Sequence, residues 1–229
     1  MRNMKDYREN ELRNYVIANL LIIVIFTESL NQLFFTNDLV HSVVNTISFA
    51  FLTSIIYIFV FILDGLLPSS FKDRLIFLKK NKLPGFTIFT DIRSNKISDI
   101  RFSQEKILNT HAEIYNKLDG LIVGTEEIKK FENEQWYGLY ICNKESEMIS
   151  TSQRDYLLTR DMYISTISIS ILYLFFSLIV VTIEFNLPVL IYFLVMAVLT
   201  NIVTRVKVRK FVLNVIALSI YKKERGNDE

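Results

Sequence analysis

The sequence predicts a mainly α-helical fold, in which a four-helix transmembrane bundle of two hairpins carries a small, mostly helical cytoplasmic domain between spans two and three. Three observations predict it. Of the 229 residues, 51% are hydrophobic, yet 22% are charged. The apolar residues gather in four long runs, and all 26 Lys and Arg lie outside these runs. Such segregation is typical of apolar spans joined to a polar domain.

Each of the four apolar runs is long enough to cross a bilayer, which takes about 20 residues in a helix. The runs cover residues 15–35, 43–63, 163–183 and 187–203. The first is not expected to be a cleaved signal peptide. The segment before it carries acids as well as bases, and no small-x-small cleavage pattern follows it.

The distribution of Lys and Arg predicts the orientation of the spans. These residues occur only in the N-terminal tail, in residues 72–160 and in residues 205–225, and the two short loops after spans one and three contain none. By the positive-inside rule, both termini and the middle segment are cytoplasmic. We therefore expect a multi-pass protein of the inner (cytoplasmic) membrane. The predicted parts are a cytoplasmic tail (1–14), a transmembrane hairpin (15–65), a cytoplasmic domain (66–162), a second hairpin (163–203) and a C-terminal cytoplasmic helix and tail (204–229).

A short amphipathic helix is predicted where the second span leaves the membrane. Pro68 ends or bends the span, and Phe71, Leu75 and Leu78 then share one helical face. The basic residues around that face are predicted to contact lipid headgroups; they are Lys72, Arg74, Lys79, Lys80 and Lys82. The alternative is positive-inside charge with no specific lipid role.

Residues 83–161 predict a small helical domain with one strand. The alternating "FTIFT" at 86–90 favours a short strand. Residues 103–118 favour a helix that begins near Ser103, and residues 125–144 favour a helix that Thr125 can cap. A capping-box spacing at Ser152 is expected to open a helix that continues into span three. The last helix is expected to extend span four and to pack on the domain or on the bilayer.

The sequence contains no constellation that predicts catalysis, a metal or a cofactor. Its two histidines have no metal-binding spacing, and the single Cys142 has no assignable partner. An enzyme built around His111, Glu113 and the aromatic residues near Trp136 is the less favoured alternative. Residues 71–161 hold fifteen basic and fourteen acidic residues, so we expect no direct binding of nucleic acid there. A small pocket for a nucleotide second messenger stays open.

Two groups of side chains are candidates for contacts with partners. The first is aromatic: Trp136, Tyr137 and Tyr140, where core packing competes with partner binding. The second is a polar stripe on spans two and three, at Thr46, Thr53, Tyr57, Thr166, Ser170, Tyr173 and Ser177. Such a stripe predicts helix packing with self-association, or the wall of a small oligomeric pore.

Several segments carry a resemblance to other proteins. "LPSSFKDRLIF" (67–77), "LPGFTIF" (83–89), "RFS", "QWY" and "RDYLLTRD" (154–161) entering a span resemble uncharacterised bacterial four-span inner-membrane proteins that are associated with phage-defence gene clusters. The resemblance covers roughly residues 66–163 and implies a bacterial origin and a role in defence. It implies no site residues.

The sequence thus favours a non-enzymatic membrane sensor, effector or scaffold, which couples a cytoplasmic protein or small signal to the bilayer, with antiviral defence as its setting. The lipid bilayer, further copies of the chain and a cytoplasmic protein are the expected partners. A small oligomeric channel is the first alternative, and a membrane-bound enzyme is the second.

Overall fold

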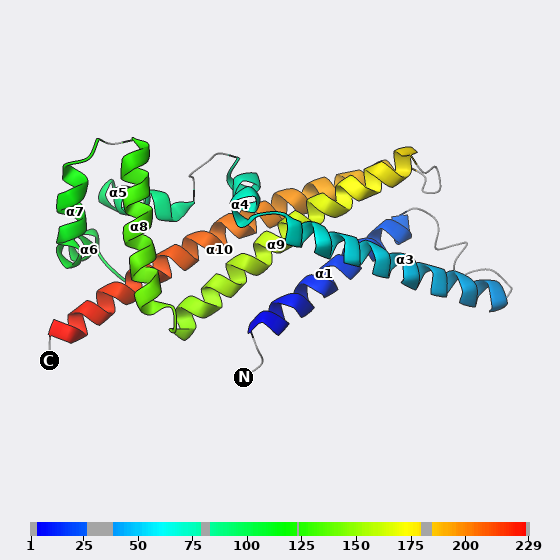
Figure 1. Cartoon of the computed structure of the whole chain (residues 1–229), viewed down its shortest axis with the longest axis horizontal. Helices are drawn as coiled ribbons and strands as arrows, with labels where there is room; N and C mark the ends of the chain where they lie inside the picture. Colours follow the sequence, from blue (N-terminus) through cyan, green and yellow to red (C-terminus); the bar gives the residue numbers. More distant parts are fainter. Residues whose placement is uncertain (1–3, 27–38, 79–82, 123, 180–184, 228–229) are drawn as a thin grey trace. The chain divides into compact units, whose positions relative to one another are not determined.

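The computed structural model describes residues 4–26, 39–78, 83–122, 124–179 and 185–227, which are helical with no β-strand (Figure 1). The elements are α1 (Met4–Phe26), α3 (Leu39–Leu66), α4 (Ser69–Phe77), the 3₁₀ helix η1 (Pro84–Phe86), α5 (Ile88–Arg93), α6 (Gln104–Thr110), α7 (Ala112–Asp119), α8 (Glu126–Asn143), α9 (Glu147–Ile179) and α10 (Leu187–Asn227). The predicted mainly α-helical class is therefore confirmed for these residues.

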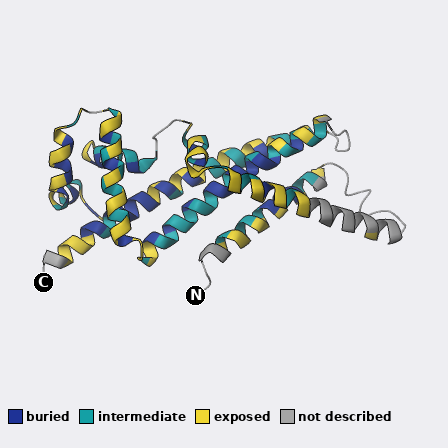
Figure 2. Cartoon of the chain, viewed as in Figure 1, coloured by how far each residue is buried: buried dark blue, intermediate teal, exposed yellow. Residues whose placement is uncertain are grey.

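Among the described residues, two helices are long and apolar enough to cross a membrane. They cover Glu147–Leu178 of α9 and Leu187–Arg225 of α10. A further pair, Ser54–Leu66 and Ser69–Phe77, is bent by 96° at the break that contains Pro68. Large apolar side chains along the second half of α9 and the first half of α10 are exposed, as contact with lipid requires (Figure 2). The protein is therefore a membrane protein by the length and composition of its helices.

The chain divides into two compact units. Unit 1 contains residues 1–72 and 157–204, and unit 2 contains residues 73–156 and 205–229. Helices α9 and α10 contribute residues to both units without leaving the helical conformation. Residues 205–229, which fall in the C-terminal helix and tail expected to extend span four, belong to the same unit as 73–156.

The core of unit 1 is built from pairs of apolar residues spaced by one helical turn. Its buried members are Val16, Leu20, Val60, Ile169, Tyr173, Val189 and Phe193. Residues four apart lie on one helical face, so α1, α9 and α10 each present a narrow apolar edge to their neighbours. Without a hydrophobic force between helices in lipid, such close packing and interhelical hydrogen bonds hold the helices together.

The core of unit 2 joins the small helices to the end of α10. Its buried members are Ile88, Phe89, Ile92, Phe102, Ile107, Ile114, Tyr115, Leu118, Ile128, Val212, Leu213, Ile216 and Ile220. The C-terminal helix was predicted to pack on the domain or on the bilayer, and the structure shows that it packs on the domain. The helix start predicted near Ser103 and the cap predicted at Thr125 are confirmed, since each side-chain oxygen accepts a backbone N–H of its helix.

Three local predictions are wrong. The alternating segment 86–90 lies in η1 and α5, because a side chain from α8 caps α5, as described below. The helix expected over 103–118 breaks at His111, whose ring turns into the core. Ser152 does not open a helix, because α9 begins at Glu147 and the Ser152 hydroxyl donates to the Met148 carbonyl at 2.9 Å. The predicted continuity of that helix into the third apolar run is confirmed.

Candidate functional site

The polar stripe predicted on spans two and three lies among the packed side chains of unit 1. The Tyr15 and Thr166 hydroxyls are 2.7 Å apart, and Thr166 is fully buried. The Tyr173 hydroxyl accepts the backbone N–H of Asn186 at 2.7 Å, and Tyr57 is half-buried against the same core. Thr166 and Tyr173 therefore form hydrogen bonds with partners inside the chain.

The remaining stripe residues give less information. Ser170 is half-buried, and the Ser177 hydroxyl donates to the carbonyl of Leu174 in its own helix at 3.2 Å. Thr46 and Thr53 belong to α3, but their side chains lie outside the described ones. The described part of the stripe thus has the contacts of a packing surface.

The aromatic residues of α8 divide into two environments. Trp136 stacks on Tyr140 with ring centroids 5.9 Å apart, meets Phe211 of α10 edge-on, and donates its indole N–H to the Val212 carbonyl at 3.4 Å. Of the three predicted partner-binding residues, Trp136 and Tyr140 are therefore engaged inside unit 2. Tyr137 is 54% exposed and is the one whose ring is open to a partner.

The basic residues predicted to meet lipid headgroups also separate. Arg74 is exposed, as that role requires, whereas Lys79, Lys80 and Lys82 lie outside the described residues. Lys72 contradicts the prediction, because it is 5% exposed and its ammonium lies 2.5 Å from the Asp64 carboxylate. The bend at Pro68 turns Lys72 back onto the end of α3, where Asp64 compensates its buried charge.

Lys72 belongs to a group of five charged residues, here called the charge cluster: Arg8, Asp64, Lys72, Arg160 and Asp161, of which Lys72, Arg160 and Asp161 are buried and the other two partly exposed. Asp161 is 2% exposed, and three cations surround it. The Arg160 Nε lies 3.2 Å away, the Arg8 Nε 3.7 Å and the Lys72 Nζ 3.8 Å. The cluster joins α1, α3, α4 and α9 within unit 1.

Sequence reasoning missed the charge cluster, although it left a signal. Asp64 and Asp161 each stand at the cytoplasmic edge predicted for a span. A carboxylate at that depth is costly without a counter-charge, so the two acids indicate that basic partners lie nearby. Spacing along the chain could not identify these partners, because Arg8 and Asp161 are far apart in sequence.

The residues of the alternative enzyme are not brought together. His111 is 2% exposed, and its Nε2 lies 3.0 Å from the Ser219 hydroxyl. Glu113, in contrast, is exposed to solvent. Burial lowers the pKa of His111 to about 4, so the ring is neutral near pH 7. In the described residues no three His, Cys, Asp or Glu side chains group as metal ligands, and Cys142 is exposed.

Glu132 is a second buried charge that sequence reasoning missed. Its carboxylate on α8 accepts the backbone N–H groups of Phe89 at 2.8 Å and Thr90 at 3.2 Å, and also the Thr90 hydroxyl. These are among the first N–H groups of α5, which have no partner within their own helix. Burial raises the pKa of Glu132, and the hydrogen bonds partly oppose that rise. A signal was present, because Glu132 shares a helical face with the buried Ile128.

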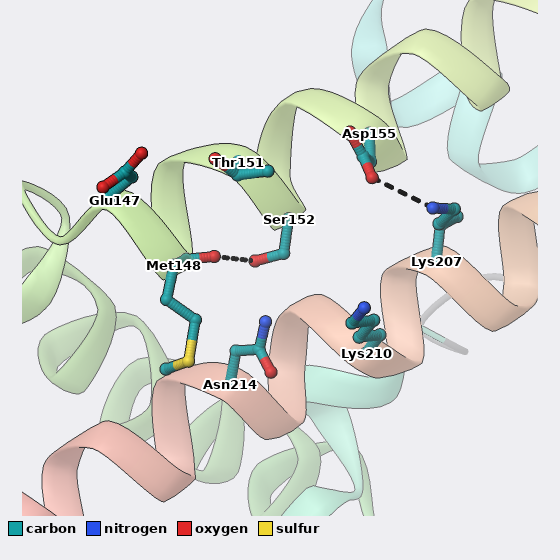
Figure 3. Close-up of a pocket in the computed structure, with 8 residues that line it drawn as sticks. All are labelled: Glu147, Met148, Thr151, Ser152, Asp155, Lys207, Lys210 and Asn214. Atoms are coloured by element: carbon teal, nitrogen blue, oxygen red, sulfur yellow. Dashed lines mark hydrogen bonds and ion pairs between the residues drawn. The ribbon is translucent and has the colours of Figure 1, made fainter.

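A pocket of about 340 Å³ lies in unit 2 between α9 and α10 (Figure 3), and it is called the α9–α10 pocket below. Its lining is Glu147, Met148, Thr151, Ser152, Asp155, Lys207, Lys210 and Asn214. Both helices contribute positions three, four and seven apart, so a polar face of each helix borders the pocket. This volume is within the range of small-molecule sites, about 300 to 1,000 Å³.

The polar groups of the α9–α10 pocket are only partly used by the chain itself. Lys207 donates to the Asp155 carboxylate at 2.9 Å. Within the described ranges, Lys210 has no carboxylate at ion-pair distance, and the Thr151 hydroxyl has no hydrogen-bond partner. Asn214 is 3% exposed, and its Oδ1 accepts Arg101 Nη1 at 2.7 Å. The pocket therefore keeps hydrogen-bond donors available for a ligand.

The chain matches no protein-family model, no curated protein and no solved structure.

Proposed function

We propose that this protein is a four-span protein of the inner membrane, with unit 2 and both termini in the cytoplasm, and that it acts as a non-enzymatic sensor or scaffold. The distribution of Lys and Arg supports the orientation. Unit 2 receives a cytoplasmic partner or signal, and the membrane helices respond. The resemblance to uncharacterised four-span proteins associated with phage-defence gene clusters supports antiviral defence as the setting of this response.

One observation carries the proposal: α9 and α10 each contain residues of both units within a single unbroken helix. A flexible linker between the domain and the spans would absorb a local change. Here the backbone hydrogen bonds of α9 continue from Glu147 to Ile179. A ligand or partner that moves the first turns of α9 can therefore act on its apolar half through the helix itself.

The packing of unit 1 supports a sensor rather than an open pore. A pore wall needs polar groups that face water, whereas Thr166 and Tyr173 bond to other groups of the chain. The same applies to Asn19, whose amide bonds to the Tyr15 carbonyl and to the Tyr192 hydroxyl. Self-association remains part of the proposal, through the exposed apolar faces of the long helices.

The orientation can be tested with the one native cysteine. Cys142 is exposed in unit 2, so a membrane-impermeant maleimide should label it in inside-out vesicles and not in intact spheroplasts. A C142S/H41C variant, with its cysteine in the predicted outer loop, should show the opposite pattern. Labelling of Cys142 in intact spheroplasts would refute the orientation and, with it, a cytoplasmic sensor.

Partner binding can be tested at Tyr137, whose exposed ring contacts the Tyr140 ring at 5.8 Å between centroids but does not belong to the core of unit 2. A Tyr137→Ala variant should lose a stoichiometric partner in affinity purification from detergent, while Lys130→Ala, at an exposed position of the same helix, should retain it. Trp136→Ala is unsuitable, because it removes the packing against Phe211. Membrane potential in cells challenged with phage then distinguishes the outputs: depolarisation indicates an effector, and a stable potential indicates a scaffold.

A further inference from the structure

We propose that the α9–α10 pocket binds a phosphate group, carried either by a small phosphorylated metabolite or by an anionic lipid headgroup. Its role as the signal site rests on the proposed function, whereas the binding itself does not. The inference depends on three features of the pocket: an amide donor of fixed orientation, the exposed Lys210 ammonium with no counter-charge among the described residues, and a volume that suits a small ligand.

The buried amide is Asn214, whose orientation is determined by Arg101. A guanidinium group only donates, so the atom that meets Arg101 Nη1 at 2.7 Å must be the amide oxygen. The amide nitrogen consequently lies on the pocket side, toward α9 (Figure 3). The residue as a whole is 3% exposed, and among the described residues this nitrogen has no hydrogen-bond acceptor. It does not belong to the fully buried polar atoms without a partner, so it is open to the pocket, where a ligand can supply the acceptor.

Arg101 also strengthens that donor. Its guanidinium is held by Asp99 through two bonds, at 2.9 and 2.6 Å, and this pairing lowers the pKa of Asp99. The guanidinium withdraws electron density from the Asn214 oxygen, which polarises the amide and makes its N–H groups better donors. The Asp99–Arg101–Asn214 chain thus presents an oriented dipole with its positive end at the pocket.

Two lysines and two carboxylates, those of Glu147 and Asp155, line the pocket, and the lysines differ in their pairing. Asp155 neutralises Lys207 at 2.9 Å, whereas Lys210 has no such partner among the described residues. Lys210 and Asn214 are four residues apart on α10, and therefore lie on one face of the helix. With the Thr151 hydroxyl across the pocket, they form a set of donors around one ammonium charge. Lysine acts in phosphate sites as such a point charge.

Size and the remaining charge restrict the ligand. A volume of about 340 Å³ is near the lower end of small-molecule pockets, so it suits a single phosphate group on a short carbon skeleton. Glu147, at the first turn of α9, is exposed and would repel a second phosphate near it. Hydroxyl groups of a glycerol or a sugar suit that end, because they can donate to its carboxylate.

Trp136 supplies a native reporter for the test. It is the one tryptophan of the chain, and its indole bonds to Val212, two residues from both Lys210 and Asn214 on α10. We would titrate the full chain in phosphatidylcholine nanodiscs with sn-glycerol 3-phosphate at constant ionic strength, and with glycerol as the control. A second arm would replace part of the phosphatidylcholine by phosphatidic acid. Trp136 fluorescence and the thermal midpoint would be recorded in both arms.

The proposal predicts a saturable response in at least one arm. Lys210→Met and Asn214→Leu should each weaken it on the order of tenfold, as expected for the loss of a hydrogen bond to a charged group. Lys222→Met, which removes an exposed lysine of the same helix, should leave it unchanged. A response to sn-glycerol 3-phosphate identifies a soluble phosphate ligand, and a response confined to phosphatidic acid identifies the lipid headgroup.

Two results would overturn the proposal. One is the absence of a saturable response in both arms. The other is equal responses of the wild type, Lys210→Met and Asn214→Leu, which would show that the phosphate acts elsewhere. Because the labelling of Cys142 is measured separately, failure of the pocket and failure of the proposed orientation remain distinguishable.

Discussion

Replacing Glu132 by alanine should release α5 from unit 2. The carboxylate is 1% exposed and accepts the N–H groups of Phe89 at 2.8 Å and of Thr90 at 3.2 Å. An unpaired buried donor costs about 1 to 3 kcal/mol. The Phe89 N–H is buried and that of Thr90 is partly so, which makes the expected loss about 2 to 4 kcal/mol for Glu132→Ala.

Glu132→Gln should cost less, below about 1 kcal/mol. A glutamine oxygen can accept both N–H groups, while its amide can donate to the Thr90 hydroxyl, so only the charge is lost. Burial raises the pKa of Glu132 above its ordinary 4.5. A raised carboxyl pKa means that the folded state binds the proton more tightly. This contribution to stability is therefore present below pH 4.5 and is lost as the pH rises through the folded pKa. The glutamine variant should lack that pH dependence.

The measurement is hydrogen exchange of residues 84–93 in the full chain, which reports local opening. A loss of 2 to 4 kcal/mol corresponds to exchange that is roughly 30- to 900-fold faster in Glu132→Ala. Glu134→Ala, at an exposed position of the same helix, should exchange like the wild type. If Glu132→Ala and Glu134→Ala exchange within threefold of each other, the carboxylate does not hold α5 in place.

Three further outcomes are expected from the same structure. Burial lowers the pKa of His111 from 6.5 to about 4, so unit 2 should lose about 3 kcal/mol as the pH falls between these values, and His111→Gln should abolish this slope. Lys72→Met should destabilise the chain in detergent by about 3 kcal/mol, because it leaves Asp64 without the ammonium at 2.5 Å, and the additional Asp64→Asn change should restore part of the loss. Gly85→Ala should cost about 1 kcal/mol and shift the emission of Trp136, because the added Cβ would lie 3.2 Å from the indole ring.

Matched controls separate these effects from general damage. Gly138→Ala introduces the same methyl group into α8 with nothing within 4 Å, so it should be neutral or stabilising by up to about 1 kcal/mol. A Gly138→Ala loss equal to that of Gly85→Ala would contradict the proposed contact. For the histidine, an unchanged slope in His111→Gln would assign the acid loss to other groups. For the ion pair, additive losses in the double variant would show that Lys72 and Asp64 are not coupled.

Local features of the sequence were enough for several elements of the fold. The helix start near Ser103, the cap at Thr125 and the continuous helix into the third apolar run were all predicted and are confirmed. Each depends on residues within one or two helical turns, where spacing determines which groups can meet. The four-span topology stays a prediction, because among the described residues two helices are long and apolar enough to cross a membrane.

The failures share the opposite property, because their causes lie far away in the chain. Residues 86–90 have a strand-like pattern, yet they are helical because Glu132, 42 or 43 residues later, satisfies the first N–H groups of α5. The helix over 103–118 breaks because His111 finds Ser219 on α10. Lys72 was predicted to contact lipid headgroups, but the bend at Pro68 places it against Asp64.

The sequence by itself determined that the described part of the chain is mainly helical and where two of its long apolar helices lie. Only the tertiary structure decided which polar groups are satisfied within the chain and which are left for a ligand, as the contrast between Lys207 and Lys210 shows. The physical reason is the range of the forces. Helix periodicity and capping act between neighbours along the chain, whereas the pairing of a buried charge or amide depends on partners that folding brings from a distance.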